Sequence, residues 1–226
     1  MAATSKNKAS IEKKKIILAD DHPLMRQGIA LLINGEGDLE VIAQAETVHE
    51  ALEAIQKQTP DLVIADFTFR ESNGLELIKD IRIRWPNLPV LVLTMHNEKY
   101  YAQRVLKAGA RGYLTKGEPP STVIKAIRAV LDGHIWVSQK VASEMLDSMV
   151  GGRMKTGGLE ELSDREFEIF ELLGRGMEMR DIALQFHLSI KTVETHRDNI
   201  RKKLGLDTSN ELLKQAFQWF HLESGS

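Results

Sequence analysis

The sequence contains no cysteine, so disulfide bonds and thiolate metal sites are excluded. It has no apolar run near the roughly 18 residues that a membrane-spanning helix needs, and no signal peptide is visible. An excess of charge of one sign is also lacking, since the formal net charge is −2, and charge balance alone therefore identifies no partner. Internal repeats are absent. These absences favour a cytoplasmic protein that does not contact a membrane.

What is present is a hydrophobic pattern that changes once along 226 residues, a length sufficient for two small domains. Up to Trp136, short apolar runs alternate with amphipathic segments, which is typical of a parallel sheet with helices on both faces. The expected strands are Ile16 to Ala19, Glu40 to Ala43, Leu62 to Ala65, Val90 to Leu93 and Gly112 to Thr115. The expected helices are Pro23 to Asn34, Val48 to Gln58, Leu75 to Arg84, Lys99 to Ala108 and Pro120 to Asp132.

Beyond Trp136 the strand signals stop. Ser138 to Met149 predicts one more helix, and the segment GGRMKTGG from Gly151 to Gly158 predicts a linker. The helices expected after it are Asp164 to Gly174, Met179 to His187, Lys191 to Leu204 and Ser209 to Phe220. We therefore expect a disordered tail over residues 1–13, an α/β domain over 14–137, a linker helix and linker over 138–158, and an all-α four-helix domain over 159–223.

Acidic residues follow two of the apolar runs. Asp20 and Asp21 end the run IILA, and Asp66 ends the run LVIA. Because the carboxyl ends of neighbouring parallel strands open into one crevice, we expect the three carboxylates to converge there. They would repel one another, and a hard divalent cation such as Mg²⁺ would relieve that repulsion.

A hydroxyl and an ammonium group stand at two further strand ends. Thr94 ends the run VLVL, and Lys116 follows GYLT. Both are groups that a phosphoryl group would need as partners. An ordinary loop residue or helix cap is the simpler interpretation of any single aspartate, but it explains five matching residues poorly. The set therefore predicts a site at which an aspartate carries a phosphoryl group beside Mg²⁺.

The second half predicts a DNA-binding unit, because two helices separated by a short turn around His187 to Ser189 suggest a helix-turn-helix. At 100° per residue, the buried stripe of the second of them is Ile190, Val193, Ile200 and Leu204. The opposite face, which would enter the major groove, carries Lys191, Glu194, Thr195, Asp198 and Lys202, flanked by Asn199 and Arg201. The candidate phosphate contacts are Lys191, Arg197, Arg201, Lys202 and Lys203. The alternative is that this charged face is merely solvated.

Charge is segregated within this unit. Residues 191–203 include five basic and two acidic residues, whereas residues 160–171 include six acidic and one basic. Such a layout would orient the unit on a polyanion. Few phosphates would be neutralised by one copy, so we expect two copies on paired half-sites.

The motifs ILADDHP, DLVIADFTFRESNGLEL, VLVLTMH and KAGARGYLTK resemble those of two-component receiver domains. LSDREFEIFELLGRGMEMRDIALQFHLSIKTVETHRDNIRKKLGL resembles a LuxR-type helix-turn-helix. Their order and spacing, over residues 14–222, resemble response regulators of the NarL/FixJ family. The resemblance implies a doubly wound, flavodoxin-like sheet of five parallel strands followed by the helical domain. It also implies a phosphorylation-switched transcription factor that binds double-stranded DNA, not an enzyme.

The resemblance assigns roles residue by residue. Asp66 would be the phosphoacceptor for a sensor histidine kinase, and Mg²⁺ would be held by Asp20, Asp21, Asp66 and the carbonyl of Thr68. Thr94 and Lys116 would bind the phosphoryl oxygens, and Tyr113 would be the aromatic switch coupled to Thr94. Glu194, Thr195 and Asp198 would contact bases, while Lys191 and Arg197 would contact the DNA backbone, with Thr192, Arg201 and Lys202 in the same DNA-binding set. Leu212 to Phe220 would form a dimer contact on activation.

Three positions depart from the receiver pattern. Arg70 stands where many receivers have proline, Met95 follows the switch threonine in place of a small residue, and Gly117 follows Lys116 in place of proline. Two alternatives remain open: a regulator of partner proteins or a phosphate sink with a vestigial C-terminal domain, and a DNA-binding protein that is not phosphorylated.

Overall fold

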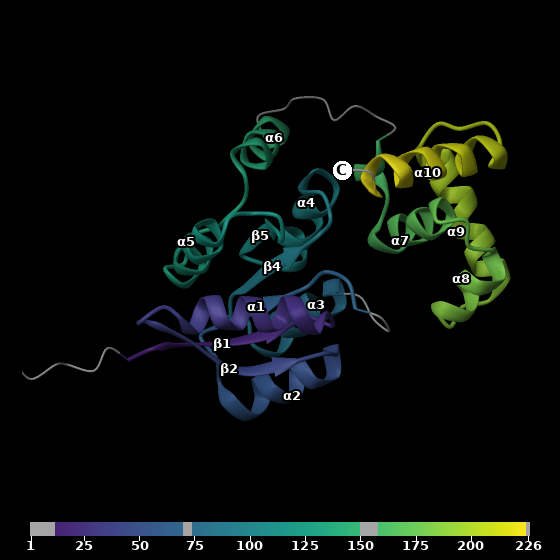
Figure 1. The fold of residues 1–226 in the computed structure, drawn as a ribbon. Coiled ribbons are helices and arrows are strands. Elements are labelled where there is room, and N and C mark those ends of the chain that lie inside the picture. The colour runs from purple at the N-terminus through teal and green to yellow at the C-terminus, as the bar shows by residue number, and fades with distance from the viewer. Residues whose placement is uncertain (1–11, 70–73, 150–157, 225–226) are drawn as a thin grey trace, which may run out of the picture. The chain divides into compact units, whose positions relative to one another are not determined.

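The structure is a computed structural model that describes residues 12–69, 74–149 and 158–224 (Figure 1). Arg70, residues 1–11 of the predicted tail and residues 150–157 of the predicted linker lie outside the described residues. The chain divides into two compact units between Ala142 and Ser143. Within the described residues, none of the helices combines the length and the apolar character needed to cross a membrane.

The first unit is built on a five-stranded parallel sheet, as the sequence predicts, and the strand order is β2-β1-β3-β4-β5. Figure 1 shows this sheet among its helices. The strands are β1 (Lys14–Ala19), β2 (Leu39–Ala45), β3 (Leu62–Ala65), β4 (Val90–Thr94) and β5 (Gly112–Thr115). The helices between and after them are α1 (Pro23–Asn34), α2 (Val48–Gln58), α3 (Gly74–Arg84), α4 (Glu98–Ala108) and α5 (Pro120–Leu131).

Helices cover both faces of this sheet. One core cluster joins α1 and α5 to alternate residues of the strands, such as Ile16 and Leu18 of β1 and Ile64 of β3. Helices α2, α3 and α4 pack together on the other face. The central strands are consequently buried on both sides, which is why they read as unbroken apolar runs.

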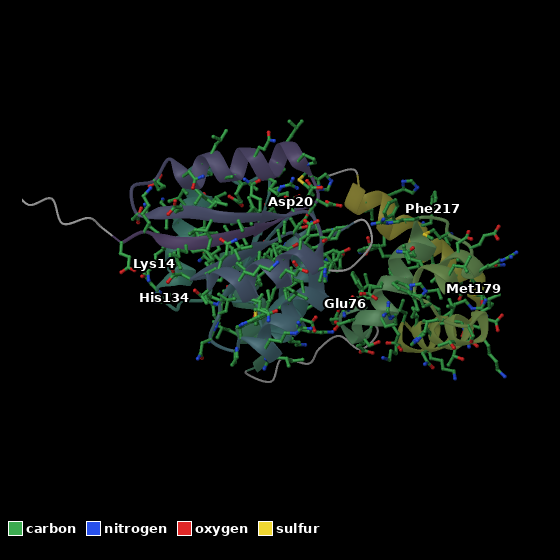
Figure 2. The ribbon with its side chains drawn as sticks, turned by 90° about the horizontal axis from the view of Figure 1, so that it is seen from below. Lys14, Asp20, Glu76, His134, Met179 and Phe217 are labelled. Carbon is green, nitrogen blue, oxygen red and sulfur yellow. The ribbon has the colours of Figure 1, made fainter. Side chains whose placement is uncertain are left out.

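Strand register positions the acidic residues. Ala19 of β1 pairs with Ala65 of β3, so both strands end at the same level and Asp20 and Asp66 are the next residues of each. The Asp66 backbone N–H donates to the carbonyl of Ala19 at 2.8 Å, which continues the pairing one residue further. Lys14 and Asp20 mark the two ends of this part of the sheet in Figure 2.

The edge strand β5 has an additional partner. Residue Trp136 forms an isolated parallel bridge with Gly112, donating its N–H to the carbonyl of Arg111 and accepting from the N–H of Tyr113. Two residues later, Ser138 donates its hydroxyl to Glu98 on α4 at 2.6 Å and caps α6 (Gln139–Met149) by accepting from the N–H of Val141.

The second unit is helical. Its elements are the 3₁₀ helix η1 (Leu159–Glu161), which the sequence analysis did not anticipate, α7 (Asp164–Gly174), α8 (Met179–Gln185), α9 (Ile190–Lys203) and α10 (Ser209–Ser224). Ser163 and Glu166 form a capping box at the start of α7. Helix α10 packs against α7, where Trp219 lies edge-on to Phe167 with ring centroids 5.5 Å apart.

Two details of the helix-turn-helix prediction were wrong. Helix α8 ends at Gln185, because His187 adopts a left-handed φ of 53° and the N–H of Leu188 returns to the carbonyl of Ala183. Ile190 is 47% exposed and is not part of the buried stripe, since it is the first residue of α9 and no preceding turn covers it. Val193, Ile200 and Leu204 are buried as predicted.

Candidate functional sites

The three predicted carboxylates converge at the carboxyl edge of the sheet. One ligand atom from each of Asp20, Asp21, His22 and Asp66 can be chosen so that all of them lie within 4.8 Å of one another. The side chains of Asp20 and Asp66 are buried. A buried cluster of carboxylate oxygens is typical of a Mg²⁺ site, because Mg²⁺ prefers hard oxygen ligands.

Lys116 is the buried counter-charge of this cluster. Its Nζ lies 2.7 Å from Oδ2 of Asp66 and 2.8 Å from Oδ2 of Asp20, and its backbone N–H donates to the carbonyl of Thr94. Three carboxylates and one ammonium group leave a formal charge of −2. A divalent cation would balance that charge, so the residues present fit the metal.

The segment after Asp66 is tightly packed. Oδ1 of Asp66 accepts from the N–H of Phe67 at 2.6 Å and from the N–H of Thr68 at 3.4 Å. Gly74, at the start of α3, lies so close that a Cβ there would be 2.4 Å from the carbonyl oxygen of Asp66. Only glycine fits at that position. The Thr68 carbonyl stays a predicted metal ligand.

The two predicted switch residues meet at the backbone of His96. Thr94 and Tyr113 are buried; Oγ1 of Thr94 accepts from the N–H of His96 at 3.4 Å, and the Tyr113 hydroxyl donates to the His96 carbonyl at 2.8 Å. The His96 ring reaches back to the acidic edge, where Nε2 lies 2.7 Å from Oγ1 of Thr68. Met95, which lies between Thr94 and His96 in the sequence, is exposed.

Sequence reasoning missed two neighbours of this region. Tyr101 on α4 is buried, and its ring lies 4.5 Å from that of His96 and 4.9 Å from that of Phe67. Arg26 on α1 is buried beside the acidic cluster. The sequence did contain a signal that Arg26 is buried. Arg26 lies on the same face of α1 as the core-facing residues Ile29, Ala30 and Ile33, three, four and seven positions later.

The predicted recognition helix is α9, the second helix of the helix-turn-helix. Lys191, Glu194, Thr195 and Lys202 are exposed, while Thr192, Arg197, Asp198, Asn199 and Arg201 are partly exposed. Ser189 caps the helix by accepting from the N–H of Thr192 at 3.1 Å. The N-terminal turns of α9 therefore present an ordered polar face.

Three of the predicted phosphate contacts have partners inside the protein, namely Arg197, Arg201 and Lys203. Arg201 donates to the carbonyls of Leu206 and Asp207, at 2.9 Å each. Arg197 contacts Sδ of Met179 at 3.6 Å and Oδ1 of Asp198 at 3.4 Å. The contacts of Arg201, and that of Arg197 with Met179, join α9 to neighbouring parts of its unit, and they leave the predicted role on DNA untested.

Lys203 has the strongest internal partner. Its Nζ lies 2.6 Å from Oε2 of Glu166, whose carboxylate also accepts from the N–H of Ser163. Burial raises the pKa of Glu166, but the hydrogen bonds from Lys203 and Ser163 outweigh it and leave that pKa below its ordinary value. In the part of the second unit that the structure describes, Lys191 and Lys202 form no ion pair, in contrast to Lys203.

Comparisons with known proteins agree with this arrangement. Residues 16–128 match the family described as the response regulator receiver domain, and residues 160–216 match the luxR family of bacterial regulatory proteins. Oxygen regulatory protein NreC of Staphylococcus epidermidis is 33% identical over 211 residues, which cover 90% of this chain and 97% of NreC.

Solved structures of response regulators are also similar to this chain. The RcsB response regulator of Salmonella typhimurium is 25% identical with a TM-score of 0.70, covering 92% of this chain and 98% of RcsB. RcsB of Salmonella enterica serovar Typhimurium, bound to the promoter rprA with the phosphomimetic BeF₃⁻, is 26% identical with a TM-score of 0.68 over 90% of this chain and 98% of that one. The similarity therefore extends over both units.

Proposed function

The chain belongs to the NarL/FixJ family of two-component response regulators, DNA-binding transcription factors that join a receiver to a LuxR-type helix-turn-helix, and from this membership we propose that phosphorylation of Asp66 is its switch. A receiver domain implies a kinase partner, and we propose a sensor histidine kinase. One observation carries the assignment to Asp66. Its carboxylate lies at the carboxyl end of β3 with one oxygen on Lys116, beside the carboxylates of Asp20 and Asp21.

In the proposed reaction, a carboxylate oxygen of Asp66 attacks the phosphorus of a phosphohistidine on the kinase. The new O–P bond forms as the P–N bond breaks, and the histidine nitrogen departs with the bonding electron pair. Lys116, already in contact with Asp66, donates to a phosphoryl oxygen, and the Thr94 hydroxyl donates to another. Asp20, Asp21, Asp66 and the Thr68 carbonyl would hold Mg²⁺, which neutralises charge on the phosphoryl oxygens when bound.

The proposed switch runs through His96. The acyl phosphate adds roughly −1.5 to −2 charges if it resembles other phosphorylated side chains. When Thr94 turns to the phosphoryl group, its long bond to the N–H of His96 is lost, and the chain that leads into α4 is free to move. A complete population shift from 1:99 to 99:1 needs about 5.5 kcal/mol of differential binding. Tyr113, which holds the His96 carbonyl, moves with this segment.

The proposed output is dimerisation and sequence-specific DNA binding. Exposed Glu194 and Thr195, with Asp198, are the proposed base contacts, and the proposed backbone contacts are Lys191, Thr192, Arg197, Arg201 and Lys202. RcsB has been solved as dimers bound to DNA, and we propose that this protein likewise binds as a homodimer, through α10. The proposed domains are 14–137 for the receiver and 159–223 for the DNA-binding domain.

Labelling followed by intact mass spectrometry tests the phosphorylation site. The full-length protein is incubated with Mg²⁺ and a small phosphodonor, and we expect a mass gain of one phosphoryl group that is absent from Asp66→Asn. Asp61→Asn is the matched control, because Asp61 lies just before β3, at the opposite end from Asp66, and binds the N–H of Lys15. Undiminished labelling of Asp66→Asn would refute the assignment and favour a regulator that is not phosphorylated there.

A further inference from the structure

Arg26 is a buried arginine with no part in the proposed phosphorylation, metal binding or switch. Only 7% of it is exposed, although a buried charge is costly unless it is paired and hydrogen-bonded. Here it is both. Nη1 donates to the carbonyl oxygen of Asp20 at 2.6 Å, Nε donates to Oε1 of Gln44 at 3.3 Å, and Nη2 pairs with Oε1 of Glu46.

The carbonyl that Arg26 binds belongs to the peptide bond between Asp20 and Asp21. A hydrogen bond to that oxygen fixes the peptide plane, and the plane sets the direction in which each of the two side chains leaves the backbone. The preceding peptide is fixed as well, because the N–H of Asp20 donates to the carbonyl of Ala45. The two aspartates are thus held from α1 and from the end of β2 together.

We propose that Arg26 is a positioning residue for the acidic cluster. It holds Asp20 and Asp21 at the spacing in which their carboxylates receive the divalent cation, and it does so without touching the metal or the phosphoryl group itself. This inference rests on the proposed metal site. The three contacts diverge from one planar guanidinium group, and a lysine, which carries the same charge at a single nitrogen, cannot reproduce them.

Two simpler roles predict different results. If Arg26 acted only through its charge, a lysine would preserve metal binding. If it served only folding, it would resemble Arg128, which links α5 to the segment before β2 through Glu36 and Asp38, away from the acidic cluster. Arg128→Lys is therefore the matched control, because it breaks a comparable set of guanidinium bonds in the same unit.

The test measures Mn²⁺ binding to the full-length protein by electron paramagnetic resonance, with Mn²⁺ as the probe and no phosphodonor present. We expect Arg26→Lys to raise the dissociation constant about tenfold, the lower end of the range for residues that orient metal ligands. Arg128→Lys should bind as the wild type does, whatever its thermal unfolding temperature. In labelling, Arg26→Lys should need about tenfold more Mg²⁺ for half-maximal rate, with a plateau rate close to that of the wild type.

Glu46→Gln provides a second variant in case Arg26→Lys does not fold. Its side chain is 59% exposed, and glutamine keeps an acceptor for Arg26 while losing the charge, so we expect a smaller rise in the same constant. Wild-type affinity in Arg26→Lys, or in Glu46→Gln where Arg26→Lys does not fold, would overturn the positioning role alone. A wild-type protein that binds no Mn²⁺ would overturn the metal site and the inference with it.

Discussion

Replacing Lys203 by methionine tests whether this basic residue stabilises the C-terminal unit or contacts DNA. The sequence placed Lys203 among the phosphate contacts, but in the structure its Nζ lies 2.6 Å from the carboxylate of Glu166. This pair joins the last turn of α9 to the first turn of α7. We therefore expect Lys203→Met to lower the free energy of unfolding of this unit and to leave the salt dependence of DNA binding unchanged.

The size of the effect follows from exposure. The Glu166 side chain is 6% exposed and the Lys203 side chain 39%. A hydrogen bond to a charged group contributes about 1.5–3 kcal/mol, and an exposed ion pair about 0.2–1 kcal/mol. Since one partner is buried and the other is partly solvated, we expect Lys203→Met to lower the free energy of unfolding by about 1–2 kcal/mol. In a domain of this size each kcal/mol lowers the unfolding temperature by about 4–8 °C.

Lowering the pH should remove the difference in the free energy of unfolding between wild type and Lys203→Met. The pKa of Glu166 is lowered in the folded state, so its contribution is present above the ordinary pKa of a glutamate, about 4.3, and is lost as the pH falls through the lower folded-state pKa. Wild type and Lys203→Met should therefore differ at pH 7 and converge once the pH falls below the lowered folded-state pKa of Glu166. A double-mutant cycle with Glu166→Gln, which keeps an acceptor for the N–H of Ser163, isolates the pairwise part.

Lys202→Met is the matched control, because Lys202 is the exposed neighbour that forms no ion pair within the part of this unit that the structure describes. It should leave stability unchanged and reduce the slope of log K against log salt by about one. Urea unfolding and a salt series of DNA-binding isotherms measure the two quantities. Equal stability of Lys203→Met and wild type at pH 7, together with a reduced salt slope, would refute the reasoning.

Three further predictions concern the same unit. Glu194→Ala should relax base preference at one operator position by about 1–3 kcal/mol, measured by selection on random DNA, and an unchanged sequence preference would rule out base reading. The fragment from Leu159 to Ser226 should be helical by circular dichroism and bind operator DNA without phosphorylation, because it has its own cap and core; an unstructured fragment would show that the boundary is misplaced. Gly174→Ala should lower stability by about 1–3 kcal/mol in thermal unfolding, since the new Cβ would be 2.5 Å from the carbonyl oxygen of Ala216, and an unaltered unfolding temperature would mean that α10 can shift.

The fold of the first unit was predictable because its information is local and repeated. Each buried strand is an apolar run, and parallel register brings the ends of those runs to one edge, so the sequence alone predicts that Asp20 and Asp66 lie together. The end of β2 was not predictable in this way. Its Gln44 and Ala45 are in the strand because β1 pairs with them, and no hydrophobic pattern records that pairing.

Polar partners were the part that the sequence did not reveal. Periodicity indicates which face of α9 is outward, but it cannot show that Arg201 bends back to the carbonyl of Leu206 or that Lys203 meets Glu166. The same limit applies to Arg26, whose spacing marked it as buried without identifying Asp20 as its partner. Lys203 and Glu166 are 37 residues apart in the sequence. Arg201 and Leu206, and likewise Arg26 and Asp20, are near in sequence, but their contacts depend on how the chain turns at the end of a helix, which periodicity does not record.

The bridge from Trp136 to β5 and the bond from Ser138 to Glu98 have a consequence for exchanging domains between regulators. Trp136 occupies the outer edge of β5, which would otherwise offer open backbone groups to another chain. Ser138 then attaches the first turn of α6 to α4, and Val141 is buried there. A receiver cut after residue 137 and fused to a foreign output domain would lose this attachment. A junction beyond Met149, where α6 ends, would transfer the edge cover and the attachment intact.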